Sequence, residues 1–63
     1  MSLTNEEKAK LYDDYVFESQ QLQRANSKIK SEFAGNIPLH QQRVIDKNNE
    51  LIEVLSKKLE SLF

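Results

Sequence analysis

The side chains able to do chemistry in this sequence are few and scattered. Its 63 residues contain one histidine, His40, and no cysteine. His40 is followed by two glutamines and an arginine. No acid, cysteine or second histidine therefore stands at the spacing that a metal ion or a nucleophile–base pair needs. We expect no catalytic residue, no metal site and no cofactor, and we interpret the chain as a protein that is not an enzyme.

One acid stands inside an otherwise apolar helical stripe. Glu18 falls between Tyr15 and Leu22, and a buried carboxylate has to be paired or protonated. Lys57 and Lys58 are the cations within reach if the chain folds back on itself. Two interpretations stay open: a carboxylate at the edge of the stripe that reaches water, which we favour, and an ion pair at an interface.

Basic residues gather in the middle of the chain. Residues 24–47 have a net charge of +3, whereas residues 1–23 have −3 and residues 48–63 have −1. A basic cluster can bind the phosphates of a nucleic acid, although interleaved Glu32 and Asp46 favour an ordinary solvated face. The candidate nucleic-acid residues, which lie near His40, are Arg24, Lys28, Lys30, Arg43 and Lys47.

The stretch that organises the chain runs from Pro38 to Phe63. Counted from Ile45 in alternating steps of three and four, it forms a heptad seam, which buries itself only against another helix. The asparagine in this seam, Asn48, is either a selector of register and partner or a polar residue at a wet edge. The seam consists of Ile45, Asn48, Ile52, Leu55, Leu59 and Leu62.

A first helix is predicted over residues 5–34, after an N-terminal tail of residues 1–4 that could derive from an expression vector. Thr4 and Glu7 have the spacing of a capping box, in which each side chain bonds the backbone of the other residue. The apolar positions lie within about 40° of one direction at ~100° per residue. They are Leu11, Tyr15, Leu22, Ala25, Ile29 and Phe33.

Residues 35–38 predict a turn between this helix and a second helix over residues 39–63. Gly35 can take the left-handed conformation that ends a helix, Asn36 is a candidate N-cap, and Pro38 suits the start of the next helix. A short turn makes the helices antiparallel. Residues that lie side by side in the two helices then have residue numbers that sum to about 73. The expected hairpin core is Leu11, Tyr15, Leu22, Ala25, Ile29, Phe33, Ile45, Ile52, Leu59 and Leu62. A domain-swapped long helix would satisfy the same pattern.

Both helices carry more apolar residues than a two-helix contact uses. The surplus predicts a partner, because contiguous exposed apolar surface usually marks an interface. We expect either two hairpins in a four-helix bundle or one hairpin docked on helices of another protein. The basic loop end and acidic open end favour an antiparallel homodimer. The expected interface residues are Tyr12, Val16, Phe17, Val44, Asn48, Leu51, Leu55 and Phe63.

The sequence as a whole predicts an all-α, coiled-coil-like helical hairpin in a single domain. Its favoured function is a protein–protein interaction and oligomerisation module, a scaffold piece of a larger protein or complex. The alternative is a small RNA- or DNA-binding hairpin dimer, and a peripheral membrane piece is the weakest interpretation. Without an apolar run of about 20 residues or a signal peptide, we expect no membrane span and a location in the cytoplasm or nucleus rather than secretion.

Overall fold

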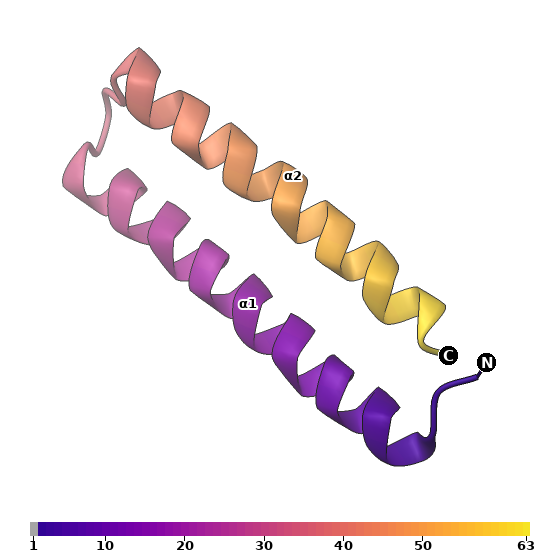
Figure 1. Ribbon diagram of the computed structural model, residues 1–63. Coiled ribbons are helices and arrows are strands. Elements are labelled where there is room, and N and C mark those ends of the chain that lie inside the picture. The colour runs from indigo at the N-terminus through magenta and orange to yellow at the C-terminus, as the bar shows by residue number, and fades with distance from the viewer. Residues whose placement is uncertain (1) are drawn as a thin grey trace.

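The computed structural model describes residues 2–63 and shows two helices packed against each other (Figure 1). Helix α1 spans Asn5–Glu32 and helix α2 spans Leu39–Ser61. The helices are antiparallel, so the two ends of the chain lie together at one end of the hairpin and the turn lies at the other (Figure 1). The predicted all-α hairpin is confirmed. Met1, part of the expected N-terminal tail, lies outside the described residues.

The start of α1 is fixed by the capping box that the sequence predicts. The Thr4 hydroxyl oxygen accepts a hydrogen bond from the Glu7 backbone N–H at 3.2 Å, and the Glu7 carboxylate accepts from the Thr4 N–H at 3.2 Å. Two backbone donors that the first helical turn leaves free are thereby satisfied. Glu6 and Glu7 also place negative charge at the positive end of the helix dipole.

The turn differs from the prediction in its start and in the N-cap that follows it: α1 ends at Glu32, two residues before the predicted end at position 34. Gly35 has φ +87°, the left-handed conformation expected after α1. Asn36, predicted as the N-cap of α2, does not take that position. Pro38 does, with an extended backbone (φ −59°, ψ 151°) and no side-chain cap. Its carbonyl accepts from the N–H groups of Gln41 and Gln42 at 3.0 and 2.9 Å, because the ring holds φ near the value the helix start needs.

Gly35→Ala is expected to lower the free energy of unfolding by about 1 kcal/mol, because an L side chain resists positive φ. The added methyl group itself meets open space, with no atom within 4 Å, so the effect is conformational and not steric. Gly35→Asn is the matched variant, since asparagine tolerates this region better. Urea unfolding, monitored by circular dichroism, measures the free energy of unfolding of both variants. Equal losses for alanine and asparagine would contradict this explanation.

Side-chain contacts fix the register between the helices. The ammonium group of Lys58 lies 5.7 Å from the centre of the Tyr15 ring, and the rings of Tyr12 and Phe63 meet edge to face at 6.1 Å between centroids. Together with the asparagine contacts described below, these pairs show that level positions in α1 and α2 have residue numbers summing to between about 73 and 75.

The core between the helices is narrow. Ile45, Leu55 and Leu62 are the buried hydrophobic residues among those described, with 2%, 6% and 7% of their surface exposed. The other seam positions are half-buried. The hairpin is an elongated body whose Cα atoms extend 48 × 14 × 13 Å. Two helices cover each other on one side only, so both long faces of the hairpin stay open to further packing.

Two predicted positions differ from the structure. Ala25, expected in the hairpin core, is exposed, and its neighbour Asn26 is buried instead. Leu55, expected at an oligomer interface, is buried within the hairpin. For Ala25, the assumed direction of the contact between the helices differs by part of a turn from the observed one, so the adjacent Asn26 takes the inward position. Leu55 belongs to the heptad seam, which faces α1, so the hairpin itself buries it.

Candidate functional site

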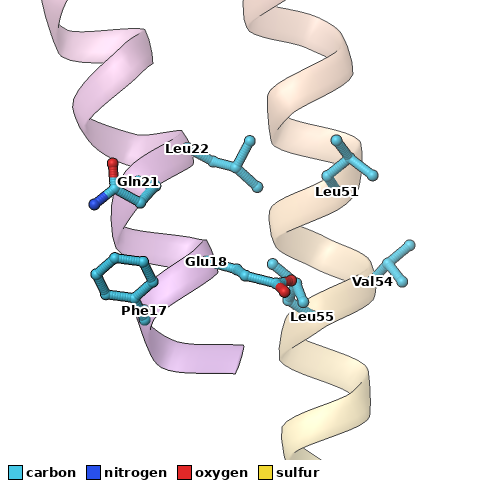
Figure 2. Close-up of a pocket in the computed structure, with 7 residues that line it drawn as sticks. All are labelled: Phe17, Glu18, Gln21, Leu22, Leu51, Val54 and Leu55. Atoms are coloured by element: carbon cyan, nitrogen blue, oxygen red, sulfur yellow. The ribbon is translucent and has the colours of Figure 1, made fainter. Parts of the chain in front are cut away.

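An apolar groove lies on one long face of the hairpin, between α1 and α2. Its volume is about 330 Å³. Figure 2 shows that α1 contributes one wall and α2 the other. The residues that line it are Phe17, Glu18, Gln21, Leu22, Leu51, Val54 and Leu55.

The α2 wall is built by a second apolar stripe beside the heptad seam. Leu51 and Val54 each precede a seam residue by one position, so they point ~100° away from the α1 contact. They are 42% and 47% exposed, and Val44, two turns before Leu51, is 44% exposed. Lys47 lies between Val44 and Leu51 on this stripe, and Lys58 follows one turn after Val54. Helix α2 thus carries two parallel stripes, of which the hairpin buries one.

The α1 wall carries the most exposed apolar side chain of the groove. Phe17 has 60% of its surface exposed, and its ring lies on α1 away from the gap between the helices, whereas Leu22 extends from α1 toward α2 (Figure 2). Leu22 is half-buried and Leu55 is buried, so they form the floor. A phenylalanine in this position gains little from the hairpin itself, and a partner on this face would cover it.

Glu18 is the charged side chain of the groove. It is exposed and extends from α1 toward α2 (Figure 2). The two lysines considered as its partners contact other groups: Lys57 lies 3.9 Å from Glu53, and Lys58 lies over the Tyr15 ring. This placement fits a carboxylate that reaches water at the edge of the apolar stripe.

Two other predicted interface residues form a separate cluster at the open end of the hairpin. Tyr12 and Phe63 contact each other, and they are 45% and 87% exposed. A cavity of about 400 Å³ beside them is also lined by Asn5, Lys8, Ala9 and Asp13. Val16 is half-buried. This cluster is more polar than the groove, so the groove is the stronger candidate for a contact surface.

Three asparagines connect the helices at a level nearer to the turn than to the open end of the hairpin. The Asn26 side-chain amide donates to the Asn49 side-chain oxygen at 3.0 Å, and the Asn48 amide donates to the Asn26 oxygen at 2.9 Å. Asn26 is 6% exposed, the one buried polar residue among those described. Asn48, considered either as a selector of register and partner or as a polar residue at a wet edge, contacts the other helix of its own chain.

The five candidate nucleic-acid residues are all exposed but do not share one face. Lys28 and Lys30 lie two residues apart on α1 and so point ~200° apart around the helix. Lys28 also lies 4.0 Å from Glu32, which places an acid beside it. His40 is exposed near the start of α2. The fold spreads these charges around the hairpin and forms no single basic surface from them.

Two further findings concern residues 2–63. Neither helix has an apolar stretch long enough to cross a lipid bilayer. Histidine, aspartate and glutamate side chains do not gather in threes that could hold a metal ion. Comparisons of the chain with protein-family models, with curated proteins and with solved structures give no match.

Proposed function

We propose that this chain is an oligomerisation module that packs its apolar groove against the helices of a second chain. The observation that carries the proposal is the exposure of Phe17, Leu51 and Val54 on the same face. These side chains surround a groove whose floor is already apolar, so helices packed over this face would cover a mostly apolar surface.

The energetics favour association of moderate strength. Completing the burial of a half-exposed aliphatic or aromatic side chain contributes roughly 1 kcal/mol. With Val44, four such side chains per copy give a dimer about 8 kcal/mol, which is comparable to the estimated 4–15 kcal/mol that association costs. Additional packing and polar contacts then decide whether the free energy of association is favourable. We therefore expect a dimer whose population depends on protein concentration.

Light scattering on a size-exclusion column, between about 1 and 300 µM protein, tests the proposal over the affinity range expected for such a surface. We expect the mass to rise toward twice that of the chain. Phe17→Ser should shift the transition to at least tenfold higher concentration, because it removes the largest exposed apolar group of the groove. Its helical circular dichroism should stay unchanged, since Phe17 is mostly exposed within the hairpin.

Leu39→Ser is the matched control for this variant. Leu39 is also a large exposed hydrophobic residue, 70% exposed, but it lies beside the turn and not in the groove. It should leave the dimer unchanged. A helical monomer at all concentrations, or equal effects of Phe17→Ser and Leu39→Ser, would contradict the proposal. The first result would direct the search to helices of a different protein.

A further inference from the structure

We infer that the groove receives a second copy of this chain with the two turns at opposite ends, so that α1 packs on α1 and α2 on α2 about a two-fold axis through Gln21. The inference rests on the proposed function and adds the orientation of the second copy and its contacts.

The groove side of α1 has a sequence pattern that is symmetric about Gln21. Phe17 and Gln21 line the groove, and residues at steps of three or four continue along the same side of the helix. Pairs of positions lie four, seven and eleven residues from Gln21 on either side. All seven side chains are exposed. The stripe reads Lys10, Asp14, Phe17, Gln21, Ala25, Lys28 and Glu32.

Antiparallel pairing about Gln21 brings complementary residues together. Phe17, the large exposed ring, faces Ala25 of the second copy, where the small side chain leaves room for it. Asp14 faces Lys28 of the second copy, and Lys10 faces Glu32. Each contact occurs twice because the two-fold axis repeats it. The pattern therefore places a large side chain against a small one and each charge against an opposite charge.

Helix α2 gives the same axis independently. Its exposed stripe contains Leu51 and Val54, which straddle a midpoint between positions 52 and 53. The observed register between the helices, with level positions summing to between about 73 and 75, places this midpoint level with Gln21. A single two-fold axis that runs across the hairpin from α1 to α2, at right angles to its length, thus relates both stripes, and Leu51 faces Val54 of the second copy at the groove.

One contact of this arrangement is unfavourable. Lys47 faces Lys58 of the second copy, and the pair occurs twice. The ammonium group of Lys58 is drawn toward the Tyr15 ring of its own chain, at 5.7 Å, and Lys47 is exposed and can extend into water. The four opposite-charge contacts of α1 outnumber these two like-charge contacts.

The opposite orientation is less complementary. With both turns at the same end, α1 would lie on α2 of the second copy at level positions. Phe17 would then face Lys57 or Lys58, and Lys28 would approach Lys47. Such like-charge and charge-on-apolar contacts disfavour a wrong orientation. The length of the hairpin, 48 Å by 14 Å across its Cα atoms, provides a face of the size that a standard interface of roughly 800 Å² per partner needs.

Gln21→Cys tests the axis directly, because the chain contains no cysteine. The introduced thiols of two copies meet at the two-fold axis, so oxidised glutathione should convert the protein to a covalent dimer. Gln20→Cys is the matched control, since Gln20 is exposed but lies outside the groove, on the surface formed with Gln23 and Ser27. Denaturing electrophoresis should show dimer formation about tenfold faster for Gln21→Cys.

A second experiment does not depend on disulfide geometry. Asp14→Lys and Lys28→Asp should each raise the dimer dissociation constant about tenfold, because each disrupts two symmetric ion pairs. The double variant should return it to near the original value. Both residues are exposed, so the hairpin itself tolerates the exchange.

The outcomes separate the inference from the proposed function. A dimer that Phe17→Ser dissociates, but in which Gln21→Cys crosslinks no faster than Gln20→Cys and the charge exchange fails to restore affinity, would overturn the two-fold arrangement and leave the proposed function in place. A protein that is monomeric at every concentration would overturn both. Selective crosslinking together with restored affinity supports the arrangement.

Discussion

Asn26→Ala is expected to lower the free energy of unfolding by about 2 to 3 kcal/mol. The substitution removes two hydrogen bonds that connect α1 to α2, at 3.0 and 2.9 Å, each worth about 1 kcal/mol. It also leaves the half-buried Asn48 amide without this acceptor and opens space beside it. Because the hairpin buries few aliphatic side chains, a loss of this size should leave much of the chain unfolded at 25 °C.

Asn36→Ala is the matched control for this experiment. Asn36 is an exposed asparagine in the turn, and its backbone N–H, which bonds the Phe33 carbonyl at 3.0 Å, is retained in alanine. Asn36→Ala should lower the free energy of unfolding by less than about 0.5 kcal/mol, as is usual for surface substitutions. Urea unfolding at a fixed protein concentration compares the two. Equal stability of both variants would show that the asparagine contacts do not hold the helices together.

The asparagines also show which part of the fold was accessible from the sequence. Asn48 is recognisable because it interrupts a heptad seam of aliphatic residues. Applying the same alternating steps of three and four to α1 from Tyr15 selects Ser19, Leu22 and Asn26, and these positions are half-buried or buried in the structure. The predicted stripe followed the apolar residues instead and so included Ala25. The buried position of Asn26 could therefore have been predicted from its spacing along α1, counted from Tyr15, although its side chain is polar.

The helices and the turn follow from local chemistry, which is why they can be predicted. The Thr4 and Glu7 capping box and the left-handed Gly35 each depend on a few neighbouring residues. The groove depends on how the two helices are rotated against each other. A change of ~100° in that rotation exchanges adjacent residues between core and surface, as Ala25 and Asn26 illustrate. The surplus of apolar residues could be predicted, but its division between the two faces could not.

Leu55 and Val54 allow the fold and the groove to be tested separately. Leu55→Ala is expected to lower the free energy of unfolding by about 2 to 4 kcal/mol, because it truncates one of the few buried side chains of the hairpin and leaves a cavity. Leu55 also forms the floor of the groove, so dimerisation should be lost with the fold. Circular dichroism should show reduced helix content at the concentrations where we expect the natural chain to dimerise.

Val54→Ala should give the contrasting result. Val54 is adjacent in sequence and lines the same groove, but 47% of its surface is exposed and it lies outside the seam. Helix content should therefore be retained, since alanine favours helix more than valine does, while light scattering shows weaker association. If Val54→Ala unfolds the chain as Leu55→Ala does, the hairpin depends on the dimer for its fold, and α2 would bury both of its stripes in one cooperative core.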